Sequence, residues 1–203
     1  MKNDLTELVF ILDKSGSMSD LASDTIGGYN SLLKQNREAP GEAVVSTVLF
    51  DHRVEVLHDR VPIDQVKHLT ANDYVPAGCT ALLDAVGGAI RYHERVQKIL
   101  PAGYRPAHTL FCITTDGLEN ASKRYTYPQV KRMIEASRER GWEFMFLGAN
   151  IDVAAEAGRL GIDEDCAVPF AATSDGCAAA FDEMFLTTAA VRSGVGAKNR
   201  ARR

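Results

Sequence analysis

Continuous runs of apolar residues alternate along this chain with segments whose apolar residues recur at helical spacing. Residues 8–12 are apolar throughout, which is typical of a strand buried on both faces of a parallel sheet. Further runs of strand length lie at residues 44–50, 53–57, 109–114, 142–147 and 166–170. Helical patterns lie at residues 22–33, 83–90, 130–137, 153–160 and 177–191. This order predicts an α/β fold of the Rossmann-like, three-layer α/β/α kind, with a six-stranded, mostly parallel sheet.

One run differs from the others because its side chains alternate between polar and apolar. It covers residues 53–57 and follows a tight corner at Asp51 and His52. Alternation is typical of a strand with one exposed face, and a tight corner joins antiparallel neighbours. We therefore expect one antiparallel strand at an edge of the sheet.

The length and composition fit one domain. A chain of 203 residues that is 45% hydrophobic supplies a single core and leaves no room for two sizeable ones. We expect this domain to cover residues 1–195. Residues 196–203 carry Lys198, Arg200, Arg202 and Arg203 after a stretch with Gly and Ser, and we interpret them as a basic, disordered tail.

The net charge and the apolar runs argue against two classes of partner. The net charge is −4, so there is no basic excess for nucleic acid or an anionic membrane surface. No stretch approaches the roughly 20 apolar residues of a membrane helix. The apolar run near the N-terminus is interrupted by Glu7 and ended by Asp13, unlike a secretory signal. We expect a cytoplasmic protein without nucleic-acid or membrane partners, and its oligomeric state stays open.

Three segments rich in side-chain oxygen stand where strands are predicted to end or helices to begin. The run at 8–12 leads into Asp13-Lys14-Ser15-Gly16-Ser17, the run at 109–114 leads into Thr115-Asp116-Gly117, and residues 76–80, ending in Thr80, precede a helix. Open α/β sheets place their ligands at the carboxyl ends of strands. Each segment alone has a structural interpretation, because serine is a common N-cap and Asp-Gly a common turn. The three together indicate one site.

The pattern D-x-S-x-S, followed by G-x-T and a strand-ending D-G, resembles the metal-ion-dependent adhesion site (MIDAS) of von Willebrand factor A (VWA) domains. The resemblance covers about residues 5–170. It implies metal ligands at Asp13, Ser15, Ser17, Thr80 and Asp116. It also implies that the first and fourth strands are neighbours, and that one coordination position is left for an acidic residue of a partner protein. The chain is also similar to the small stand-alone prokaryotic VWA proteins, including those encoded near tellurite-resistance genes.

These five side chains suit a hard divalent cation. Every donor atom is oxygen, and the set has no His or Cys to attract zinc. The two carboxylates among them balance the charge of a divalent ion without an excess of negative charge, and the three hydroxyls add none, so the ion can still attract a further carboxylate. We predict Mg²⁺, with Mn²⁺ or Ca²⁺ as alternatives, and a protein partner that offers Asp or Glu.

Two other classes of function use a similar sheet. A Mg²⁺-dependent phosphohydrolase also places Asp after its first strand, but its D-x-D pattern is absent because Ser15 occupies the second position. A nucleotide-binding protein would carry G-x-x-x-x-G-K-[ST], or G-x-G-x-x-G after the first strand, and the sequence has neither. We predict a metal-dependent protein-binding module that is not an enzyme, with the phosphohydrolase as the alternative.

Other acidic residues near these segments receive a structural role or none. Asp84, one turn into its helix, is expected to interact with the positive end of the helix dipole. Orienting a metal-bound water is a second interpretation of Asp84. Asp51 and Glu119 lie near the segments only in sequence, and neither is assigned a role.

Two glycine pairs, Gly27-Gly28 and Gly87-Gly88, lie inside predicted helices. Each glycine costs about 1 kcal/mol there relative to alanine. We expect close packing of the helices to offset this cost.

Overall fold

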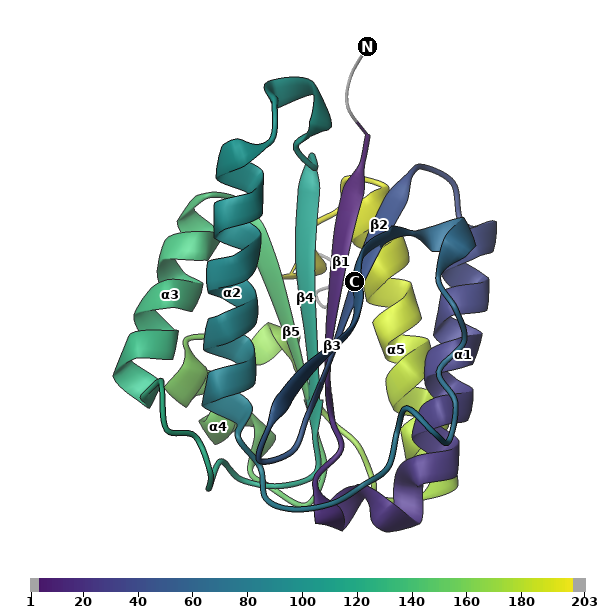
Figure 1. The fold of residues 1–203 in the computed structure, drawn as a ribbon, viewed down its shortest axis with the longest axis vertical. Coiled ribbons are helices and arrows are strands. Elements are labelled where there is room, and N and C mark those ends of the chain that lie inside the picture. Colours follow the sequence, from purple (N-terminus) through teal and green to yellow (C-terminus); the bar gives the residue numbers. More distant parts are fainter. Residues whose placement is uncertain (1–3, 199–203) are drawn as a thin grey trace.

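The computed structural model describes residues 4–198, and its centre is a six-stranded sheet (Figure 1). The strands are β1 (Thr6–Asp13), β2 (Ala43–Phe50), β3 (Val54–Pro62), β4 (His108–Thr115), β5 (Trp142–Gly148) and β6 (Ala167–Pro169). Their order is β3-β2-β1-β4-β5-β6, and every pairing is parallel except that of β2 with β3. The predicted mostly parallel sheet with one antiparallel edge strand is confirmed.

Helices cover both faces of the sheet. Figure 1 shows α1 (Ala22–Glu38) and α5 (Ser174–Arg192) on one side, and α2 (Leu82–Ile99), α3 (Tyr127–Glu139) and α4 (Val153–Leu160) on the other. Strand β1 supplies both cores, because Leu8, Phe10 and Leu12 face α1 and α5 while Val9 and Ile11 face α2 and α3. All five side chains are fully buried. Burial on both faces explains why residues 8–12 of this strand are continuously apolar.

Strands β1 and β4 are neighbours at the centre of the sheet, as the resemblance implies. The chain leaves β1 toward α1 on one face and leaves β4 toward α3 on the other. The carboxyl ends of β1 and β4 therefore flank the point where the connections diverge, the usual ligand-binding place in such sheets.

The edge strand β3 is longer than the predicted 53–57, because it continues to Pro62. Its pairing with β2 shifts register near Thr47, and Arg60 has φ of 50°. A strand with a bulge accommodates the polar residues Asp59 and Arg60. The last strand is shorter than the predicted 166–170 and covers only Ala167–Pro169.

The first residues of the expected tail lie against the domain. Ala197 is buried, and its N–H donates to the carboxylate of Glu143. Lys198 Nζ lies 2.7 Å from Asp163 Oδ2. The rest of the expected tail, residues 199–203, lies outside the described residues. Within residues 4–198, no helix combines the length and the apolar character needed to cross a membrane.

One glycine of each pair packs closely, and the other does not. A Cβ added to Gly28 would lie 2.2 Å from Cδ2 of Phe181 in α5, and one added to Gly87 would lie 2.7 Å from Cγ of Tyr125. A Cβ added to Gly27 or Gly88 would meet no atom within 4 Å. The expected close packing therefore holds for Gly28 and Gly87 only.

Gly27→Ala and Gly28→Ala are expected to shift stability in opposite directions. Gly27→Ala should raise the free energy of unfolding by up to about 1 kcal/mol, since alanine favours the helix and meets nothing. Gly28→Ala should lower it by about 1 to 3 kcal/mol, since the buried ring of Phe181 must move. Urea denaturation of both variants measures the two changes. Two shifts of the same sign would contradict this packing.

Candidate metal site

The carboxylate of Asp13 lies at the carboxyl end of β1 and is held from two sides. Its Oδ1 accepts a hydrogen bond from the N–H of Ser15 at 2.7 Å, and its Oδ2 accepts one from Oγ1 of Thr115 at 2.6 Å. Asp13 is only 1% exposed. Since Thr115 ends the neighbouring strand β4, the sheet itself fixes the direction of this carboxylate.

Hydroxyl groups connect the first loop to Asp116. Ser15 Oγ lies 3.2 Å from Ser17 Oγ, and Ser17 Oγ donates to Asp116 Oδ1 at 2.5 Å. Ser15 and Asp116 are buried, whereas Ser17 is exposed. The structure thus brings together four of the five side chains that the sequence singles out, at the carboxyl ends of β1 and β4.

Thr80, the fifth residue, lies next to this group. A Cβ added to Gly117 would lie 3.6 Å from Thr80 Oγ1 and 3.8 Å from Ser17 Oγ, so both hydroxyls line the space beside Gly117. Backbone bonds also tie the loops together, since Gly16 N–H donates to Gly78 O at 3.1 Å and Ala77 N–H donates to Lys14 O at 2.9 Å.

Two residues that support the site, Thr115 and Tyr74, were not identified from the sequence. Thr115 Oγ1 contacts Asp13 and also lies 3.0 Å from Gly117 O, so it fixes the turn that follows Asp116. The buried hydroxyl of Tyr74 donates to the backbone carbonyl of Asp13. Thr115 adjoins the motif and was available as a signal, but nothing in the sequence connects Tyr74 to residue 13.

The electrostatics of the site favour a cation. Burial raises the pKa of Asp13 to about 6, although hydrogen bonds from Thr115 and Ser15 act in the opposite direction, and the charge of Asp116 raises it further. Burial also raises the pKa of Asp116. A cation between the two carboxylates would offset both burial and repulsion.

The donor set fits a hard divalent cation. Among residues 4–198, no three His, Cys, Asp or Glu side chains are grouped so that they could hold a metal ion. Any metal held here therefore needs ligands of another kind beside Asp13 and Asp116. The hydroxyls of Ser15, Ser17 and Thr80 are positioned to supply them, and oxygen ligands suit Mg²⁺, Mn²⁺ or Ca²⁺.

The other acidic residues have structural contacts that correct the sequence interpretation. Glu119 accepts hydrogen bonds from Leu83 N–H and from its own loop, so the view that it is near the site only in sequence was wrong. Asp84 accepts the N–H groups of residues 123–125, which occupies its carboxylate and leaves no support for an oriented metal-bound water. The backbone carbonyl of Asp51 accepts the N–H of Ala81 at 2.8 Å.

Similar solved structures include several VWA domains. The von Willebrand factor domain of the type V pili tip protein Mfa5 from Porphyromonas gingivalis has a TM-score of 0.63 at 14% identity, over 94% of this chain and 96% of that one. Proximal thread matrix protein 1 from the mussel byssus, with a zinc-occupied MIDAS motif, has a TM-score of 0.62 at 15% identity over 91% of this chain. This chain spans only 46% of the mussel protein.

A third similar structure is the manganese-loaded TRAP protein of Plasmodium vivax, with a TM-score of 0.61 at 15% identity, over 88% of this chain and 72% of that one. The sequence matches no protein-family model and no curated protein. At these identities the likeness is one of fold, and the fold of this chain is that of VWA domains.

Proposed function

We propose that this chain, with its VWA fold, holds a divalent cation through Asp13, Ser15, Ser17, Thr80 and Asp116 and there binds an acidic side chain of a partner protein. The observation that carries the proposal is the hydrogen-bonded series from Ser15 through Ser17 to Asp116. It joins oxygen atoms from loops 99 residues apart in the sequence. Convergence of this kind is what a cation with oxygen ligands requires.

Hydrogen bonds within the chain orient the two carboxylates of the proposed site. Thr115 and the N–H of Ser15 orient the carboxylate of Asp13, and Ser17 orients that of Asp116. The ligand hydroxyls add oxygen atoms without adding negative charge. When bound, the ion would supply a positive centre that the two carboxylates balance but do not over-balance, and that centre would attract a further carboxylate. We propose Mg²⁺ as this ion, with Mn²⁺ and Ca²⁺ as substitutes.

The site is open on one side, which a partner needs. Asp13, Ser15 and Asp116 are buried, but Gly16, Ser17 and the segment at residues 78–79 are exposed. A side chain from outside can therefore approach past Ser17 while the two carboxylates stay at the base. This arrangement suits the recognition of a protruding Asp or Glu.

Peptides selected from a display library on this chain in millimolar Mg²⁺ are expected to share an Asp or Glu. Their binding should fall at least about tenfold with EDTA, with Asp13→Ala, or when the acidic residue becomes its amide, because each change removes one side of the ionic contact. Fluorescence anisotropy measures the affinities. Asp51→Asn, which changes a buried acid outside the ligand set, should retain binding. Equal binding to Asp13→Ala would defeat the proposal.

The alternative of a phosphohydrolase is tested with the same variants. Ser15 stands where such an enzyme carries its second acid, and its hydroxyl faces Ser17. The similar structures reported above are those of a pilus tip protein, a thread matrix protein and the TRAP protein of Plasmodium vivax. Turnover of an aryl phosphate that disappears in Asp13→Asn would favour the enzyme over the binding module.

A further inference from the structure

Helix α2 begins beside the candidate site without a capping side chain of its own. Its N-cap residue is Ala81, and the first N–H groups of a helix find no acceptor within the helix. Here the acceptors come from residues 119–122, the segment that follows Asp116. Leu83 N–H donates to Glu119 Oε2 at 2.9 Å, and Asp84 N–H donates to Ser122 Oγ at 3.0 Å.

The same segment holds the backbone of Thr80 on both sides. Thr80 N–H donates to Asn120 Oδ1 at 2.9 Å. The carbonyl of Thr80 accepts the N–H groups of Asn120 and Ala121 at 3.0 and 3.2 Å. Thr80, which precedes α2, is therefore held by the loop that follows Asp116.

The carboxylate of Glu119 contacts both α2 and its own loop. While Oε2 accepts from α2, Oε1 accepts from Ala121 N–H at 2.9 Å and Ser122 N–H at 2.7 Å. Ser122 Oγ also donates to Oε2 at 2.7 Å. One carboxylate thus shapes its own loop through Oε1 and caps the neighbouring helix through Oε2.

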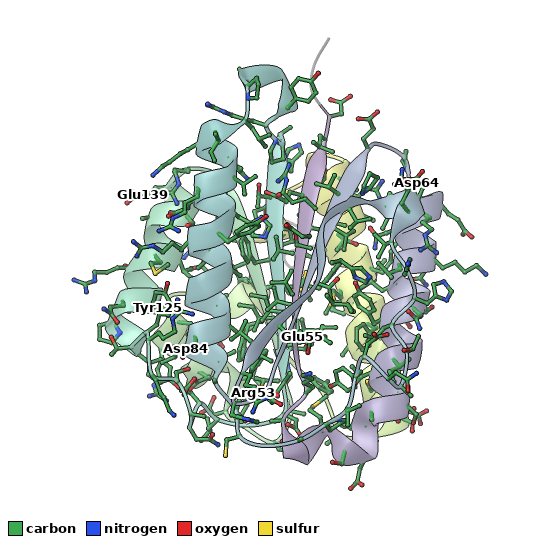
Figure 2. All side chains as sticks on the ribbon, viewed as in Figure 1. Arg53, Glu55, Asp64, Asp84, Tyr125 and Glu139 are labelled. Atoms are coloured by element: carbon green, nitrogen blue, oxygen red, sulfur yellow. The ribbon has the colours of Figure 1, made fainter. Side chains whose placement is uncertain are left out.

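Asp84 in α2 also contacts the segment that follows Ser122. Its carboxylate accepts the N–H groups of Lys123, Arg124 and Tyr125 at 3.0, 2.9 and 3.0 Å. Figure 2 labels Asp84 and Tyr125 on the same side of the molecule, where α2 begins and the chain leads into α3. Residues 80–84 and 119–125 are therefore linked in both directions.

We infer that Glu119 is a positioning residue that makes Thr80 and Asp116 one rigid unit, so that the two ligands keep their spacing. The inference rests on the proposed function for its consequence, since the spacing matters only when a cation is held. The hydrogen bonds that couple the two loops are present without a cation. Glu119 itself has no place among the proposed ligands.

Glu119→Ala is expected to weaken Mn²⁺ binding by about 10- to 100-fold, the usual effect of removing a group that orients metal ligands. Glu119→Gln retains one acceptor oxygen and should lose less. The matched control is Asp152→Ala, which removes the carboxylate that caps α4 by accepting Ala155 N–H at 3.0 Å. This control should destabilise the domain similarly and leave Mn²⁺ affinity within about twofold. Isothermal titration calorimetry measures the affinities, and equal affinity of wild type and Glu119→Ala overturns the inference.

Amide hydrogen exchange of the metal-free chain separates this inference from the proposed function. In Glu119→Ala, faster exchange is expected at residues 80–85 and 116–122 together, while Asp152→Ala should change only the region of α4. Faster exchange confined to Leu83, Ala121 and Ser122, the amides bonded to Glu119, would overturn the coupling. If wild type fails to bind Mn²⁺, the proposed function fails while the exchange result still decides the coupling. If Glu119→Ala does not fold, Glu119→Gln serves both measurements.

Discussion

Arg60→Met is expected to lower the free energy of unfolding by about 3 to 5 kcal/mol, because it leaves a buried carboxylate without its cation. Glu7 in β1 is fully buried and forms an ion pair with Arg60 of β3. Gln97 Nε2 donates to Glu7 Oε2 at 2.6 Å, and His93 Nδ1 lies 3.2 Å from Oε1. Burial, and then the charge of Arg60, lower the pKa of His93 to about 4, so its ring is neutral at pH 7 and the charge that balances Glu7 is that of Arg60 rather than of His93.

Urea denaturation measures this loss, and two further variants identify its origin. Lys198→Met removes an ion pair in which both partners are partly exposed, and it should cost at most about 1 kcal/mol. The double variant Glu7→Gln/Arg60→Met removes both charges and should recover more than half of the loss, since burying an unpaired charge is the main cost. A double variant as unstable as Arg60→Met would show that lost packing of the arginine stem is the cause.

Mn²⁺ or Mg²⁺ at about a hundredfold excess over its Kd is expected to raise the free energy of unfolding by about 2.7 kcal/mol. For a domain of this size the melting temperature should rise by roughly 5 to 10 °C. The physical reason is the pair of buried carboxylates, Asp13 and Asp116, whose mutual repulsion a cation relieves. Differential scanning calorimetry with and without EDTA measures the shift.

Asp13→Asn should abolish this response while leaving the metal-free protein at least as stable as wild type. Asparagine has the shape of aspartate and removes a buried charge that Asp116 opposes. Asp51→Asn, a buried acid that follows the neighbouring strand β2, should keep the full response. The assignment of the ligands would be refuted if the metal did not change the melting temperature of wild type, or if it raised that of Asp13→Asn as much as that of wild type.

The sequence predicts the fold where periodicity alone determines it. The central strands are recognisable because both of their faces are buried, and α4 is found at the predicted residues, 153–160. The prediction fails where a distant partner decides the outcome. Glu7 looked like an interruption of an apolar run, but it belongs to β1 because Arg60, far along the chain, compensates its charge. For the same reason the continuation of β3 past residue 57 was missed.

The candidate site, like the fold, could be predicted only in part from the sequence. The spacing in the first loop and the Asp-Gly turn pointed to side chains that the structure brings close together, and their role as ligands stays a prediction. The residues that orient them were not found, because Tyr74 and Glu119 act through backbone groups that a motif does not record. Glu119 was assigned no role from the sequence. A sequence pattern identifies ligand types, whereas the three-dimensional contacts identify their supports.

The hydrogen bond between Tyr74 and the carbonyl of Asp13 has a consequence for the order of folding. It spans 61 residues, and the bond from Thr115 to Asp13 spans 102. Closing loops of this length costs entropy before any contact repays it, and contacts between distant residues form slowly. During refolding the first loop therefore reaches its final shape only after the middle of the chain has docked. Affinity for a cation should appear only after these contacts have formed, so the ion reports that Tyr74 and Thr115 have reached Asp13.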